Sequence, residues 1–135
     1  MSQANVEVVL TFLDAYSRGD YEALLQFCSP DVEGYPDVSV FPEPRPRVGH
    51  AELQAFFEEI GSAWAAPPRY VVTEMVPAEG DRVLVRGEWV GKGAASGIES
   101  RSEWSIIFTI RDSQIARIAW LSDHVGALKA VGLGE

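Results

Sequence analysis

Apolar residues in the first half of the chain recur at helical spacing. A first helix is predicted over about Asn5 to Ser17, with a stripe formed by Val6, Val9, Leu10, Leu13 and Tyr16. Gly19 is a natural helix stop and Asp20 a natural N-cap, so a short second helix is predicted from Tyr21 to Cys28. A third helix is predicted in "HAELQAFFEEIGSAW", and its apolar stripe is Leu53, Phe56, Phe57, Ile60 and Trp64.

From Arg69 onward the pattern changes to β-rich segments. "RYVVTEMVPA", "RVLVRGEWVG", "SRSEWSIIFTI" and "QIARIAWL" are separated by short turn signals, which predicts four consecutive antiparallel strands. A short strand is expected at Val32 to Tyr35, and the proline-rich "PDVSVFPEPRPRVG" should be a surface loop. A last helix is predicted over about His124 to Val131.

This order of elements predicts an α+β fold in a single domain, residues 1–135. The N-terminal helices should cover one face of a curved antiparallel sheet. A bent sheet closed by helices on one side leaves a conical cavity, which is where a small ligand would bind.

The charge balance argues against several classes of partner. The chain carries 20 acidic and 11 basic residues, a formal net charge of −9, so neither nucleic acid nor a membrane surface is expected to bind it. The single cysteine, Cys28, excludes an intrachain disulfide and suits a reducing cytoplasm. Two scattered histidines with one cysteine show no metal-ligand spacing, and no cofactor is expected.

Three segments resemble the NTF2-like superfamily in its SnoaL-like, polyketide-cyclase-like branch. They are "FLDAYSRGDYEALLQFCSPDVEGY", "GHAELQAFF" and "IARIAWLSDHVGALKAVGL", and they span nearly the whole chain in the right order. The resemblance implies an NTF2-like cone and a homodimer. The superfamily includes ketosteroid isomerases, polyketide cyclases, epoxide-hydrolase-like enzymes and non-catalytic binding domains, so the fold alone leaves the function open.

Ketosteroid isomerase chemistry is not expected. That family uses a tyrosine on the first helix, a protonated aspartate and a second aspartate as base. The corresponding positions here are Phe12, Ile106 and Pro36. Phenyl and aliphatic side chains have no proton to donate, so two of the three roles are absent. Asp37 stays a candidate because a one-residue shift of the loop would place it at the base position.

The epoxide-hydrolase-like branch offers a second comparison, because it carries an Arg-x-Asp pair on a middle strand. Arg86 and Glu88 have the same spacing, which puts both side chains on one face of a strand. Such a pair could polarise an epoxide oxygen while an acid activates water. The alternative is a surface pair facing Arg101 and Glu103 across a hairpin. The last-strand aspartate of that branch falls on Trp120 here.

The polyketide-cyclase branch resembles this chain most at the C-terminus. There, an aspartate near the exit of the last strand acts as general acid or base, and Asp123 is similar in position. The alternative is that Asp123 is the N-cap of the final helix, since Asp is a preferred capping residue. Hydrogen bonds from that helix would lower its pKa, which suits a cap better than an acid at neutral pH.

Aromatic and aliphatic residues are expected to line the cavity. On the third β-rich segment, Ser102, Trp104, Ile106, Phe108 and Ile110 share one face. Ile118 and Trp120 should lie beside it, and Phe12, Tyr16 and Tyr35 are candidates for the opposing wall, with Trp64 as a further binding residue. Aromatic residues on both sides suit a flat apolar ligand.

The opposite face of the sheet should carry Trp89, Ile107 and Leu121 among polar residues. An uncovered apolar patch there would favour pairing with a second copy of the chain.

Two functions follow. One is a cofactor-independent isomerase, cyclase or hydrolase with Asp123, Glu88 and Arg86 as its catalytic groups. The other is a non-catalytic domain that binds an apolar ligand or dimerises.

Overall fold

The computed structural model describes residues 3–37, 39, 41 and 45–133 and contains a six-stranded sheet with four helices. In chain order the elements are α1 (Gln3–Ser17), α2 (Tyr21–Leu25), β1 (Cys28–Tyr35), β2 (Arg47–Val48), α3 (Gly49–Gly61), β3 (Arg69–Ala78), β4 (Arg82–Lys92), β5 (Glu99–Arg111), β6 (Gln114–Leu121) and α4 (His124–Ala130). No helix in the described ranges is long and apolar enough to cross a membrane.

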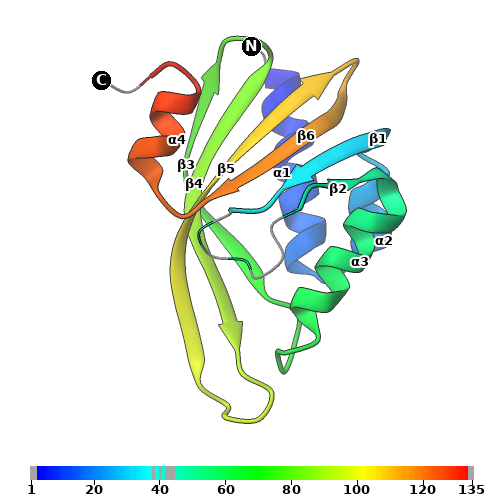
Figure 1. Ribbon diagram of the computed structural model, residues 1–135, viewed down its shortest axis with the longest axis vertical. Coiled ribbons are helices and arrows are strands. Elements are labelled where there is room, and N and C mark those ends of the chain that lie inside the picture. The colour runs from blue at the N-terminus through cyan, green and yellow to red at the C-terminus, as the bar shows by residue number, and fades with distance from the viewer. Residues whose placement is uncertain (1–2, 38, 40, 42–44, 134–135) are drawn as a thin grey trace.

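The sheet is curved and unclosed, with the strand order β2-β1-β6-β5-β4-β3. The predicted meander is confirmed, since β3, β4, β5 and β6 pair with their neighbours in antiparallel fashion. The N-terminal strand β1 joins β6 in parallel, which makes the sheet mixed at that edge. Figure 1 shows α1, α2 and α3 on one side of the sheet, α4 on the other, and the ends of β4 and β5 extending beyond the helices.

The main core lies between the inner face of the sheet, which faces α1 to α3, and those helices. Val83 pairs with Phe108 and Val85 with Ile106 on neighbouring strands, and all four side chains belong to this core. The helices contribute most of the apolar stripes expected from the sequence, represented by Val9, Leu13, Tyr16, Leu53, Phe56 and Phe57. Phe12 joins this core from α1, whereas Leu10, which was expected in the stripe, is exposed. The α+β layout with helices over one face of a curved sheet is therefore confirmed.

Several expectations about these elements are wrong. The third helix ends at Gly61, so Trp64 lies beyond it, and Arg47–Val48 forms the strand β2 inside the predicted proline-rich loop. The second helix ends at Leu25 rather than Cys28, because Cys28 already pairs with Ile115 as the first residue of β1. Trp89 lies on the inner face of the sheet, whereas the sequence pattern predicts it on the outer face. The register of the β4–β5 hairpin sets Trp89 opposite Ser102, two residues from Trp104, so these side chains share one face.

The outer face carries a second, smaller apolar cluster beneath α4. Leu84 and Ile107 pack there against Ala127 and Val131, with Leu121 at its edge. Ile107 and Leu121 are thus on the expected face, but the chain's own last helix covers them.

Candidate functional site

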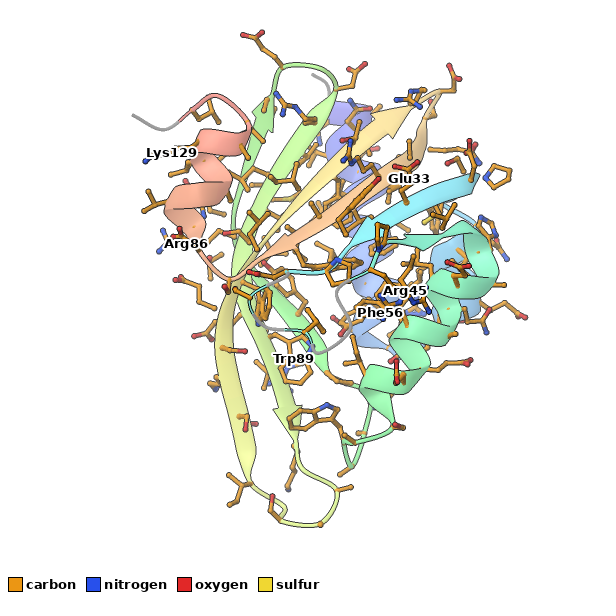
Figure 2. The ribbon with its side chains drawn as sticks, viewed as in Figure 1. Glu33, Arg45, Phe56, Arg86, Trp89 and Lys129 are labelled. Carbon is orange, nitrogen blue, oxygen red and sulfur yellow. The ribbon has the colours of Figure 1, made fainter. Side chains whose placement is uncertain are left out.

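A cavity of about 270 Å³ lies between the inner face of the sheet and the helices α1 and α3. Ten of its lining residues are aromatic, and they include every tryptophan of the chain. Among the residues that the structure describes, the lining consists of Phe12, Leu13, Tyr16, Phe41, Phe56, Phe57, Ile60, Trp64, Tyr70, Trp89, Ser102, Trp104, Ile106 and Trp120. Figure 2 shows Phe56 and Trp89 pointing into the space between α3 and the β4–β5 hairpin.

Glycines on the inner face of the sheet make room for these rings. A Cβ added at Gly91 would lie 2.9 Å from the Trp89 ring and 3.0 Å from that of Trp64. One added at Gly34 would lie 3.2 Å from the ring of Trp120. Side chains at either position would displace an aromatic wall, so glycine there leaves the rings room to lie against the strands.

The rings of the cavity hold one another in tilted and edge-to-face contacts. Trp64 and Trp89 meet with centroids 4.7 Å apart at 72°, and Phe57 meets Trp120 at 6.0 Å and 82°. Phe41, which follows β1, packs against Phe56 at 5.5 Å and Trp104 at 6.0 Å. These geometries are those that aromatic pairs prefer, so the walls are packed by specific contacts.

Three hydrogen bonds account for most of the polar atoms in the cavity. The indole Nε1–H of Trp89 donates to the Tyr16 hydroxyl oxygen at 2.9 Å. The Tyr70 hydroxyl donates to the backbone carbonyl of Trp104 at 2.6 Å, and the Trp104 indole donates to Ser102 Oγ at 3.2 Å. Burial raises the pKa of Tyr16 to about 12, partly offset by the Trp89 hydrogen bond, and burial raises the pKa of Tyr70 as well.

The described residues of the lining include no aspartate, glutamate, histidine, lysine or arginine. Both phenols stay protonated at neutral pH, so none of these described lining groups changes charge near pH 7. Among the residues that the structure describes, no three potential ligand side chains gather where they could hold a metal ion. The site offers apolar contact and neutral hydrogen-bond donors.

Most of the candidate binding residues meet at this cavity. The six that line it are Phe12, Tyr16, Trp64, Trp104, Ile106 and Trp120. Ile118 points to the same face, where it is fully buried in the core, and it does not line the cavity.

Tyr35 and Asp37 lie away from the cavity. Tyr35 pairs with Ala119 and points to the outer face, where the Arg117 guanidinium lies 4.3 Å from the centre of its ring. The Asp37 carboxylate accepts hydrogen bonds from the backbone and hydroxyl of Ser122, both at 2.7 Å, and from those of Ser39. Partial burial raises the pKa of Asp37, but these four bonds outweigh it and hold the pKa at about 2.

The structure places Arg86 and Glu88 on the face of the sheet opposite the cavity. Arg86 pairs with Glu103 at 3.0 Å, and Arg101 pairs with Glu88 at 3.1 Å, across the β4–β5 hairpin. These four side chains are between 40% and 55% exposed. Figure 2 shows Arg86 on the side of the sheet away from Phe56 and Trp89. The geometry is that of surface ion pairs, which contribute about 0–1 kcal/mol each.

Asp123 is the N-cap of α4. Its carboxylate accepts a hydrogen bond from the Val125 backbone N–H at 3.1 Å, and the residue is exposed. His124 Nδ1 lies 2.7 Å from the buried hydroxyl of Ser105 on the outer face. None of Arg86, Glu88 and Asp123 lines the cavity.

Three lining residues, Phe41, Tyr70 and Trp89, were missed by the sequence interpretation. The hairpin register contained the signal for Trp89, because a residue opposite Ser102 must share the face of Trp104. Tyr70 then follows as the partner of Trp89 on β3. Phe41 lies in the proline-rich loop, where a lone aromatic residue needs a surface on which to pack.

Comparison with known proteins identifies the family. The sequence model of the SnoaL-like domain matches residues 9–118. No protein with curated annotation matches the chain. Among solved structures, TerC, co-crystallised with polyporic acid, has 22% identity and a TM-score of 0.77 over 96% of this chain and 98% of its own.

Two further structures share the fold. An NTF2-like protein from Burkholderia pseudomallei K96243 is 19% identical, with a TM-score of 0.77 over 98% of this chain and 99% of its own. A protein assigned to the SnoaL-like polyketide cyclases, from Jannaschia sp. CCS1, is 19% identical, with a TM-score of 0.75 over 100% of this chain and 98% of its own. The chain therefore belongs to the SnoaL-like domain family, and its fold is the NTF2-like fold.

Proposed function

We propose that this protein binds an uncharged, flat, aromatic molecule in the cavity between the sheet and α1 and α3. The observation that carries the proposal is the lining itself, whose described residues include ten aromatic and no charged side chains. Flat rings gain both area burial and ring–ring contact against such walls. A charged ligand would lose its hydration without gaining an ionic partner, which is strongly unfavourable.

The structural relatives support a small organic ligand. TerC, which has the same fold, was co-crystallised with polyporic acid, so this fold can accompany a bound small molecule in at least one relative. The Jannaschia sp. CCS1 structure, assigned to the polyketide cyclases, also supports a small organic ligand. At identities near 20% these likenesses concern the fold, and the ligand class proposed here rests on the lining of this chain.

Binding is favoured over carboxylate catalysis by the positions of the candidate groups. General acid–base catalysis needs the group within hydrogen-bond reach of the reacting atom. Glu88 and Arg86 are engaged in surface ion pairs, and Asp123 caps α4. Among the lining residues that the structure describes, only the phenols and a serine hydroxyl could exchange a proton with a ligand.

Ligand titration with a blocked variant tests the proposal. Ser102 is an exposed residue of the lining, whereas Arg101, the adjacent residue, points to the opposite face. Ser102→Phe should block the cavity entrance and lower the affinity for tricyclic aromatic probes at least tenfold, measured by calorimetry. Arg101→Phe adds the same ring outside the cavity and should leave the affinity unchanged. Absence of binding to the native chain, or equal binding by both variants, would contradict the proposal.

We also propose that the protein is a cytoplasmic homodimer, and two observations support this proposal. The single cysteine supports a reducing compartment, and the family resemblance supports the dimer. Because α4 covers Ile107 and Leu121, the surface left for a partner on the outer face is the region of the ion pairs and Val71, which is 40% exposed. Sedimentation analysis tests the dimer, and the mass of one chain at micromolar concentration would refute it.

A further inference from the structure

We propose that the Tyr16 hydroxyl donates a hydrogen bond to an oxygen acceptor on the ligand, so that the cavity selects flat aromatic molecules that carry a carbonyl group. This inference rests on the proposed function and specifies its ligand class further.

The hydrogen bond from Trp89 restricts the direction in which the Tyr16 hydroxyl hydrogen can point. The indole Nε1–H of Trp89 is only a donor, so at 2.9 Å it must occupy a lone pair of the Tyr16 oxygen. The hydroxyl hydrogen therefore points elsewhere, and within the described part of the chain no acceptor receives it. Tyr16 is only 9% exposed, so bulk water has little access to this donor.

The other polar groups of the cavity differ from Tyr16 in this respect. The Tyr70 hydroxyl already donates its hydrogen to the Trp104 backbone carbonyl. The indole N–H of Trp104 donates to the Ser102 hydroxyl oxygen. The indoles of Trp64 and Trp120 have no hydrogen-bond partner among the described residues, but both side chains are partly exposed and can be solvated. Tyr16 is thus the most deeply buried donor of the lining that lacks an acceptor.

The chemistry of the donor indicates what kind of acceptor fits. Burial keeps the phenol protonated, since the pKa of Tyr16 is raised to about 12. No cationic side chain belongs to the described part of the lining, so an anionic acceptor would remain uncompensated there. A ketone or quinone oxygen conjugated to a ring system accepts a hydrogen bond, carries no net charge and preserves the planar shape. An acceptor buried without this bond would lose its bond to water and gain nothing.

A matched pair of probes isolates this one bond. 9-Fluorenone and fluorene share a flat tricyclic frame and differ by a carbonyl in place of a methylene group. Dissociation constants for both probes should be measured with the native chain and with Tyr16→Phe, which keeps the ring and removes the hydroxyl. We expect the ratio of fluorenone affinity to fluorene affinity to fall about tenfold in Tyr16→Phe. Affinity for fluorene should change much less.

Tyr70→Phe is the matched control, because it removes the other phenol of the same cavity. Its hydroxyl hydrogen is committed to the protein, so the affinity ratio of the two probes should stay at its native value even if both affinities fall. The infrared carbonyl stretch of bound fluorenone gives a direct readout. It should lie at lower frequency in the native complex and in Tyr70→Phe than in Tyr16→Phe.

Each outcome decides between the two proposals. An unchanged affinity ratio in Tyr16→Phe, or an equal change in Tyr70→Phe, overturns the donor role and leaves aromatic ligand binding standing. Equal losses of both probes in Tyr16→Phe assign Tyr16 a packing role and also overturn the inference. If neither probe binds the native chain, the proposed function fails together with the inference.

Discussion

The indole of Trp89 donates its N–H to the hydroxyl oxygen of Tyr16 at 2.9 Å, which joins β4 to α1 across the cavity. We predict that Trp89→Phe lowers the free energy of unfolding by about 1 kcal/mol more than Trp64→Phe does. The control is matched because the two indoles pack edge to face on one another, while only that of Trp89 makes a described hydrogen bond. Urea unfolding of both variants measures the difference, and equal losses would show that the bond contributes nothing.

A side chain added at Gly91 would disturb the wall of the cavity from the backbone of β4. Gly91→Ala places a methyl group about 3 Å from the rings of both Trp64 and Trp89. Overpacking of this kind should cost about 1–3 kcal/mol of stability and also lower ligand affinity. Ser100→Ala, opposite Gly91 on the same hairpin and exposed, should stay within about 0.5 kcal/mol of the native chain. Thermal unfolding with and without ligand compares them, and similar effects of the two would refute the packing argument.

Asp37 should make stability depend on pH in the acid range. Its pKa in the folded chain is about 2, below the ordinary value of 3.8, so the ionised carboxylate stabilises the fold above about pH 4. This contribution is lost as the pH falls from about 4 towards 2. Asp37→Asn should therefore be less stable than the native chain at pH 7, and the gap should narrow below pH 4. Urea midpoints at pH 7, 4 and 2.5 measure this, and a constant gap would contradict it.

Asp37→Asn should also weaken ligand binding slightly. The backbone N–H of Phe41 donates to the Asp37 carbonyl at 3.1 Å, and Phe41 is part of the cavity wall. A looser anchor at Ser122 would let that wall move. Calorimetric titration of the variant at pH 7 tests the effect on affinity.

The cap and acid interpretations of Asp123 predict opposite results for one substitution. Asparagine caps helices about as well as aspartate, whereas alanine costs about 0.5–2 kcal/mol. If Asp123 serves only α4, Asp123→Asn should keep native stability and native behaviour towards any ligand, while Asp123→Ala should be destabilised. Loss of a measured turnover in Asp123→Asn, with unchanged stability, would restore the catalytic interpretation.

The layers of this fold could be predicted because periodicity reports which side of an element is buried. The stripes of α1 and α3 and the order of β3 to β6 depend only on local spacing and turn signals. The face of Trp89 could not be read from its own strand, because Leu84 and Val90 make the other side of β4 apolar as well. Only the register with β5 decides the matter, and register is a property of two strands.

The apolar character of the candidate site could be predicted from the sequence, but the identity of all its lining residues could not. Aromatic abundance indicated an apolar cavity, and six of the nine residues expected to bind the ligand line it. The alternative interpretations of the charged residues, a surface pair at Arg86 and Glu88 and a cap at Asp123, describe their observed contacts. Residue type and spacing alone could not exclude a catalytic role for Arg86 and Glu88. The same two residues at the same spacing can face either a cavity or the solvent.

The parallel pairing of β1 with β6 bears on how the chain folds. Cys28 meets Ile115 only after most of the sequence has been synthesised, and the loop between them must close before the contact is gained. Phe12 and Trp120, which face the same cavity, are separated by a similar stretch. We therefore expect β1 to dock late onto the β3–β6 meander, so that a binding-competent cavity would form only near the end of folding.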